Sequence, residues 1–269
     1  MTTYESTSGS IVHIELASDE PGETRAFFED VFGWSFEEMP EMEYLSFSPP
    51  NPPGGGIMPG EAEGPFTPPP TLLYVNVEDL AETEEAIQEA GGEILVGSMA
   101  VPEMGVFTIF REPGGVVEAA WEDTYEGEPP EGGWPQFTDE PEAGSITHVE
   151  LYSEDPEATR AFHEAVFNWT FEAMEESDYL LFEGPTPPFG GIMEATDEMP
   201  VGTLLYLLAE DAEGTIEAID DAGGSVLREP FPIEGWGTMA LFEAPGGTAL
   251  AVWESTTAED EPPEPEVAG

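Results

Sequence analysis

The chain has 269 residues, of which 59 are Asp or Glu and only 4 are Arg or Lys, so its formal net charge at pH 7 is −55. Such a chain offers no basic stripe for a phosphate backbone, which argues against a nucleic-acid partner. It contains no cysteine, which excludes disulfides, thiolate metal ligands and cysteine nucleophiles.

The acidic residues are spread along a foldable chain. Hydrophobic residues make up 39% of the sequence and 16 residues are Phe, which is not the composition of a disordered acidic chain. The balance resembles that of cytosolic proteins from salt-accumulating halophiles, where salt screens the repulsion between acids. No apolar run approaches the ~18 residues of a membrane span, and the N-terminus has no basic, apolar leader. We therefore expect a cytoplasmic protein with no membrane partner.

Residues 11–58 and 146–193 are two copies of one sequence. They align without a gap, and 28 of 48 positions are identical. Residues 71–95 match residues 203–227 in the same way. A repeat of about 130 residues has the size of an ordinary domain. We therefore predict a domain over 1–124, an acidic Pro/Gly linker over 125–143, a second domain over 144–257 and a disordered acidic tail over 258–269. Trp134 and Phe137 are the linker residues able to pack on a domain.

The first domain opens with an alternating strand over 11–17. Alternation would place Val12, Ile14 and Leu16 on one face, and Ile11, His13, Glu15 and Ala17 on the other. A helix with a proline in its first turn follows and ends near Gly33. Short strands are predicted over 34–39, 44–47 and, after a Pro/Gly-rich loop, 55–58. The order is β-α-β-β-β.

The same order returns in the second half of the domain. A strand is predicted over 72–77 and a helix over 79–90, ended by Gly91 or Gly92. Strands over 93–96, 106–110 and 116–121 follow, the last one entered through a turn at residues 112–115. Each domain is thus predicted to be an α+β fold of two βαβββ modules.

Several of these segments resemble the vicinal oxygen chelate superfamily, which holds glyoxalase I, type I extradiol dioxygenases, and bleomycin and fosfomycin resistance proteins. The segments are IVHIEL, RAFFEDVFGW, GGGIM, LYVNVEDL and REPGGVVEAAWE, the last one similar to that family's Asp-Pro-x-Gly-x-x-x-Glu ending; the second domain repeats them. The chain resembles in particular the tandem two-domain glyoxalase-like proteins. The resemblance implies that the two modules of each domain curl into a cup-shaped mixed sheet with helices outside.

The resemblance also implies a divalent metal (Zn, Ni, Mn or Fe) inside the cup. Its ligand positions in the first domain would be His13, Met58 or its neighbour, Tyr74 and Glu118. In the second domain they would be His148, Met193, Tyr206 and Leu250. Catalytic metal sites generally use three or four N or O ligands. We therefore predict His13 and Glu118 as metal ligands and Glu118 as the candidate general base, whereas Leu250 leaves the second cup without that carboxylate.

A simpler interpretation of His13 and His148 is a neutral imidazole that is hydrogen-bonded inside a polar cup. The repeated His-x-Glu pattern places two polar side chains on the strand face that lines the cavity in this family, and burying them costs free energy unless they are paired. A polar ligand site is therefore expected, with a metal as the narrower possibility. The predicted ligand-binding residues are Glu15, Tyr74, His148, Glu150 and Tyr206; for the two tyrosines, core packing is the alternative role.

Other notable side chains are interpreted as structural. Arg25 and Arg160 hold equivalent helix positions and are expected to pair with nearby acids, with anion capture as the alternative. His163 replaces Phe28 of the first helix and is expected to be exposed or packed without a chemical role. The loops 48–56 and 183–191 would lie near the cup mouths and could gate them. Core positions are expected for Trp34, Trp169, Phe36 and Phe171.

These patterns favour a glyoxalase-like protein that acts on a small oxygenated substrate as a metal-dependent lyase or isomerase. The alternatives are a small-molecule binding or resistance protein, and a structural relative that has lost its site. Extradiol ring cleavage is disfavoured, because neither cup supplies the two His and one Glu that it needs around iron. We expect a monomer with two pseudo-dimeric domains, or a weak homo-oligomer.

Overall fold

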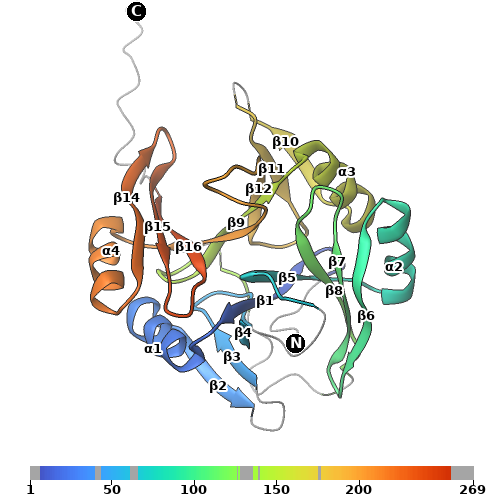
Figure 1. Ribbon diagram of the computed structural model, residues 1–269, viewed down its shortest axis with the longest axis horizontal. Helices are drawn as coiled ribbons and strands as arrows, with labels where there is room; N and C mark the ends of the chain where they lie inside the picture. Colours follow the sequence, from blue (N-terminus) through green and yellow to red (C-terminus); the bar gives the residue numbers. More distant parts are fainter. Residues whose placement is uncertain are drawn as a thin grey trace, which may run out of the picture.

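The structure is a computed structural model that describes residues 7–39, 44–60, 66–125, 127, 136–138, 140–174 and 177–255. Two eight-stranded mixed sheets, one per domain, make up most of the described chain, and two helices accompany each sheet (Figure 1). The predicted tail over 258–269 and Trp134 lie outside the described residues.

Each domain consists of two βαβββ modules, as predicted. The first domain comprises β1 (Ile11–Ser18), α1 (Pro21–Phe32), β2 (Ser35–Met39), β3 (Tyr44–Ser48) and β4 (Gly55–Pro59), then β5 (Thr71–Asn76), α2 (Leu80–Glu89), β6 (Glu93–Val101), β7 (Gly105–Arg111) and β8 (Val117–Asp123). The second comprises β9 (Ile146–Ser153), α3 (Pro156–Phe167), β10 (Thr170–Ala173), β11 (Leu180–Glu183) and β12 (Phe189–Glu194), then β13 (Gly202–Leu208), α4 (Ala212–Asp221), β14 (Ser225–Ile233), β15 (Gly237–Glu243) and β16 (Ala249–Ser255).

The strand order within a domain shows how two modules make one sheet. The first sheet runs β2-β3-β4-β1-β5-β8-β7-β6, and the second repeats this order as β10-β11-β12-β9-β13-β16-β15-β14. Inside each module the first and last strands are parallel neighbours, as β1 and β4 or β5 and β8 are. The modules join along an antiparallel seam between β1 and β5, or β9 and β13. The first strands of the modules therefore lie at the centre of each sheet.

A β-bulge in β1 changes the predicted alternation. The register shifts between Ile11 and His13, so that two residues of β1 oppose one residue of β5. Ile11 consequently packs in the main core, whereas Val12 joins the apolar cluster on the opposite face of the sheet. The predicted faces of these two residues were therefore wrong. Ile14 and Leu16 share one face as predicted, and both lie in the main core. The second domain has the same shift between Ile146 and His148.

The helices end where the sequence signals lie. Pro21 and Pro156 occupy the first turns of α1 and α3. Gly33 ends α1 in the left-handed conformation, with φ of 66°, and Asn168 takes the same role after α3, with φ of 57°. The Asp79 side chain caps α2 by accepting a hydrogen bond from the Glu82 backbone N–H.

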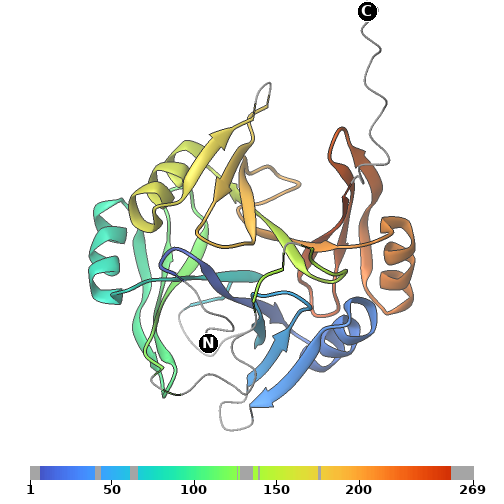
Figure 2. The same cartoon turned by 180° about the vertical axis from the view of Figure 1, so that it is seen from behind.

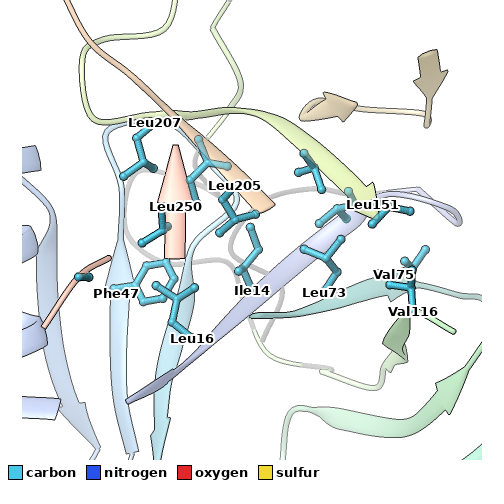
Figure 3. Close-up of a cluster of buried hydrophobic side chains, with 14 of the residues drawn as sticks. Ile14, Leu16, Phe47, Leu73, Val75, Val116, Leu151, Leu205, Leu207 and Leu250 are labelled. Atoms are coloured by element: carbon cyan, nitrogen blue, oxygen red, sulfur yellow. The ribbon is translucent and has the colours of Figure 1, made fainter. Parts of the chain in front are cut away.

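The main hydrophobic core is shared by both domains. In Figure 3, Ile14, Leu16 and Leu73 of the first domain lie in one cluster with Leu205 and Leu250 of the second. Helix α1 lies against α4 and α2 lies against α3, each pair bringing the two domains together (Figures 1 and 2). The opposite face of each sheet carries a separate apolar cluster. We call these faces the first cup, around Val12, Leu72, Tyr74, Ile109, Ala119 and Trp121, and the second cup, around Tyr152, Leu204, Tyr206, Met239 and Ala251.

Tryptophan hydrogen bonds fix the two domains together. The indole N–H of Trp34 donates to the carbonyl of Gly144 at 2.8 Å, and that of Trp169 donates to the carbonyl of Gly9 at 2.7 Å. Both tryptophans are buried, as predicted, and Phe36 and Phe171 pack against the same core. No helix in the described ranges is long and apolar enough to cross a membrane.

Candidate functional site

The first cup contains a connected cluster of polar side chains. The His13 ring is bonded through Nε2 to the Tyr44 hydroxyl at 2.7 Å. The Glu15 carboxylate accepts hydrogen bonds from Tyr44 at 3.3 Å and from Tyr74 at 2.8 Å. The structure thus brings together His13, Glu15 and Tyr74, all predicted from the sequence as site residues.

The partners in this cluster determine where its protons lie. Burial lowers the pKa of His13 well below its usual value, so the ring is neutral at pH 7. With the one hydrogen of the Tyr44 hydroxyl donated to Glu15, Nε2–H of His13 is the donor to the Tyr44 oxygen. The Nδ1 lone pair is then free. Nδ1 is buried and has no hydrogen-bond partner among the described residues.

The pKa values of the other three groups in the cluster are raised. Burial, reinforced by the charge of Glu15, raises the pKa of Tyr44 and Tyr74 well above the usual value for tyrosine, so both hydroxyls stay protonated. Burial also raises the pKa of Glu15, although the hydrogen bonds from the two tyrosines oppose this. Both hydroxyls already donate to Glu15, so the bare imidazole nitrogen of His13 is the one atom of the cluster without a partner within the described ranges.

The second cup repeats this arrangement with one addition. Nε2 of His148 is bonded to the Tyr179 hydroxyl at 2.6 Å, and Tyr152 donates to Glu150 at 2.6 Å. Tyr152 stands where the first cup has Ala17. Tyr206 lies edge-on to His148, as Tyr74 does to His13, but its hydroxyl is within 3.5 Å of the Met239 sulfur. Burial lowers the pKa of His148, so this ring is also neutral.

Two glycine-containing strands make room for the clusters. A Cβ on Gly56 would meet the ring of Tyr44, and a Cβ on Gly191 would meet the ring of Tyr179. Each tyrosine therefore lies flat over a glycine of the neighbouring strand, with its hydroxyl directed at the histidine. Tyr44, Tyr179 and Tyr152 were not predicted from the sequence. For the first two the signal was available, because they occupy the same position of the repeat, on the strand that lies two places from the His-x-Glu strand in the sheet.

The structure does not bring Glu118 together with His13. Along β8, Val117, Ala119 and Trp121 face the first cup, so Glu118 points to the other face of the sheet. There it is fully buried and bonded to Nε2 of His163, across the domain boundary, at 2.8 Å. The predicted roles of Glu118 as a ligand beside His13 and as the general base of that cup therefore have no geometric basis.

Glu118 is not the residue of β8 that corresponds to the glutamate of the family motif. In the pattern Asp-Pro-x-Gly-x-x-x-Glu, counted from Glu112, the last position falls on Ala119 rather than on Glu118. Counted from Ala244, it falls on Ala251 in the second domain. Ala119 and Ala251 pair in register with Tyr74 and Tyr206 respectively, so both lie in the cups. A methyl group thus stands in each cup where that motif has a carboxylate.

The donors in the cups do not fit a catalytic metal centre. The first cup offers one free nitrogen, on His13, while both carboxylate oxygens of Glu15 already accept hydrogen bonds from tyrosines. Met58 only packs against the apolar cluster, and Met193 is an exposed side chain. Across the described ranges, no three His, Asp or Glu side chains lie close enough together to hold a metal ion.

The remaining predicted residues are placed as follows. Arg25 pairs with Glu29 and Glu38, and Arg160 pairs with Glu157, which confirms ion pairs with nearby acids. Of the two expected placements of His163, exposed or packed, the structure has the packed one: the side chain is fully buried and bonded to Glu118. The first loop is packed, since residues 51–56 are buried.

The linker contacts the first domain through Phe137, which packs on the first cup, and through the Thr138 N–H, which donates to the Asn51 side chain.

Comparisons with known proteins agree with the fold. Residues 10–117 match the model of the Glyoxalase/Bleomycin resistance protein/Dioxygenase superfamily. The protein named "Putative glyoxylase CFP32" from Mycobacterium tuberculosis is 24% identical over 261 residues, covering 89% of this chain and 92% of that protein.

Two solved structures share the architecture at low sequence identity. The Mn(II)-bound glyoxalase from Novosphingobium aromaticivorans superposes with a TM-score of 0.64 and 14% identity, covering 93% of this chain and 83% of that one. The 2,3-dioxygenase LapB from Pseudomonas sp. KL28 superposes with a TM-score of 0.63 and 12% identity, covering 95% of this chain and 97% of that one. At these identities the likeness concerns the fold.

Proposed function

Because the chain belongs to the glyoxalase/bleomycin resistance protein/dioxygenase superfamily, we propose that it binds a small oxygenated molecule in the first cup. The observation that carries the proposal is the bare, buried Nδ1 of His13, in a cluster whose other polar groups have partners. An unpaired buried polar atom costs free energy, and a ligand hydroxyl that donates to Nδ1 would remove this cost.

The surroundings of His13 define the class of ligand. Tyr74 and Phe107 form an edge-to-face aromatic pair in the first cup, and Trp121 and Phe137 belong to the same apolar cluster. Aromatic walls with a few fixed polar groups suit a planar or apolar molecule that carries hydroxyl or carbonyl oxygens. The neutral His13 would accept a hydrogen bond from a ligand hydroxyl, because both tyrosine hydroxyls already donate to Glu15.

The second candidate is a metal-dependent lyase or isomerase of glyoxalase type. It is favoured by the shared fold with a Mn(II)-bound glyoxalase and by the one free nitrogen of His13. The donor set described above argues against it, since Ala119 supplies no ligand. Plasma mass spectrometry of protein purified in multimolar KCl tests this candidate. About one Zn, Ni, Mn or Fe per chain in the wild type, lost in His13→Ala, would favour the enzyme over the binding protein.

Calorimetric titration in molar KCl tests the binding proposal, with catechol and a 2-oxoaldehyde–thiol adduct as probes. Binding of either probe is expected to weaken by at least about tenfold in His13→Ala, which corresponds to the net value of one hydrogen bond. His148→Ala is the matched control in the second cup and is expected to retain wild-type affinity. Equal affinity in wild type and His13→Ala would overturn the assignment of the first cup.

We also propose that the protein works in a salt-rich cytoplasm, as a monomer whose two domains form a pseudo-dimer. The net charge of −55 supports the first statement. The second is supported by the core that the two domains share and by the tryptophan hydrogen bonds between them. Light scattering in molar KCl would measure the mass of the particle and check the monomer.

A further inference from the structure

The two domains meet through two equivalent contacts that the internal repeat relates. In one contact α3 meets β7 and β8, and the rings of Phe162 and Phe110 lie 5.6 Å apart. In the other contact α1 meets β15, and the rings of Phe27 and Phe242 lie 5.9 Å apart. We call these the α3 contact and the α1 contact.

The two contacts differ in one pair of side chains. The α3 contact holds His163, which stacks on Trp169 with ring centroids 4.7 Å apart; its counterpart in the α1 contact is Phe28, which stacks on Trp34 at 4.3 Å. Glu118 pairs in register with Phe110, and its counterpart Leu250 pairs with Phe242. The α3 contact is therefore polar at the position where the α1 contact is apolar.

The polar pair is fully buried and bonded on both sides of the imidazole ring. Nδ1 of His163 donates to the Thr159 carbonyl at 2.8 Å, since a carbonyl only accepts. Nε2 lies 2.8 Å from Oε2 of Glu118, and both side chains are 0% exposed. Burial opposes a charged ring, but the nearby Glu118 and, further away, Glu112 raise the pKa of His163, which favours the imidazolium as donor from both nitrogens.

We infer that the Glu118–His163 pair selects the partner of each domain: the first domain recognises the second domain of its own chain and rejects another first domain. If two first domains paired, each Glu118 would face Phe28, and a carboxylate would be buried with no partner. If two second domains paired, each His163 would face Leu250. Only the pairing of a first domain with a second domain places Glu118 against His163 in one contact and leaves apolar side chains together in the other.

The other interactions between the domains would be nearly the same whether like or unlike domains paired. Trp34 and Trp169 make the same hydrogen bond in both contacts, and the aromatic residues around them are equivalent. Glu112 accepts a hydrogen bond from Thr159 across the boundary, but Thr24 occupies the corresponding place on α1 and would serve equally well. A duplicated chain without the buried pair would therefore have nearly self-complementary domains, which invites exchange of domains between chains.

Refolding of the full chain tests this inference. The wild type and the double variant Glu118→Leu/His163→Phe are unfolded in urea and refolded in molar KCl at rising protein concentration, and the mass of the products is measured by chromatography with light scattering. The wild type is expected to return as a monomer throughout. The double variant makes both contacts apolar and alike, so its dimer fraction is expected to rise at least several-fold with concentration, although the linker still favours internal pairing.

Two further variants provide controls. Adding Phe28→His and Leu250→Glu to the double variant moves the polar pair to the α1 contact, restores the mismatch between like domains and is expected to restore the monomer. Phe28→His/Leu250→Glu alone makes both contacts polar and alike, and it is expected to form dimers even if the apolar double variant fails to fold. The inference is overturned if both of the variants with like contacts refold as the wild type does, if the quadruple variant dimerises as much as they do, or if the wild type itself pairs like domains.

Discussion

The Tyr74 hydroxyl donates a 2.8 Å hydrogen bond to the Glu15 carboxylate across the antiparallel seam between β1 and β5. The seam joins the two modules of the first domain, so the cluster draws its residues from both halves of the sheet. The corresponding seam between β9 and β13 carries Glu150 and Tyr206. Such a cluster is assembled only when the modules have docked, and its members can be tested separately.

The first prediction concerns Glu15 and pH. Its pKa is raised in the folded protein, chiefly by burial, so the folded state holds the proton more tightly than the unfolded chain does. This contribution therefore favours the folded state at low pH and is lost as pH rises from the unfolded value of about 4.3 through the raised folded pKa. Glu15→Gln is expected to flatten the pH dependence of the unfolding free energy in that window. Equal slopes for variant and wild type, measured by urea titration, would contradict the shift.

The second prediction concerns the tyrosine that links His13 to Glu15. Tyr44→Phe removes the hydroxyl that accepts from Nε2 of His13 and donates to Glu15. A buried N–H is then left without a partner, and we expect a loss of roughly 1–3 kcal/mol in unfolding free energy. Tyr179→Phe is the matched control in the second cup. His148 is more exposed than His13, so water can replace the lost partner and the loss should be smaller. Losses of equal size would argue against this difference in burial.

The third prediction concerns close packing between β4 and β1. A Cβ on Gly55 would collide with the backbone oxygen of Ile14, which cannot move without distorting the central strand. Gly55→Ala is expected to cost roughly 3 kcal/mol or more. Gly97 has no atom within 4 Å of an added Cβ, so Gly97→Ala should leave stability nearly unchanged. Thermal unfolding of both variants gives the comparison, and a mild effect at Gly55 would show that β4 can shift.

The fourth prediction concerns salt. The four arginines already have partners; for example, Arg111 pairs with Glu93, and Arg228 lies over the ring of Phe231. Most of the 59 acidic side chains therefore have no basic partner and repel one another across solvent. Screening shortens the range of their repulsion from about 10 Å at 0.1 M salt to about 3 Å at 1 M. The unfolding temperature is therefore expected to rise between 0.1 M and 2 M KCl. Sucrose of matched osmolality serves as the uncharged control, and an equal effect of sucrose would point away from charge.

The sequence by itself determined the duplication, the βαβββ modules and most element bounds, because these depend on local signals. Alternation, helical spacing, Pro21 at a helix start and Gly33 at its end are properties of short segments. The same local pattern placed His13 and Glu15 on one face of a strand, and the structure keeps them there with Tyr74.

Only the tertiary structure decided which groups meet. The bulge at Val12 arises from pairing with β5. On β8, the register places Ala119 in the cup, and Glu118, one residue earlier, on the opposite face of the sheet. Glu118 then finds His163, 45 positions away in the other domain. Pairing register and domain docking depend on the free energy of burying both partners at once, a property that neither residue's own segment contains.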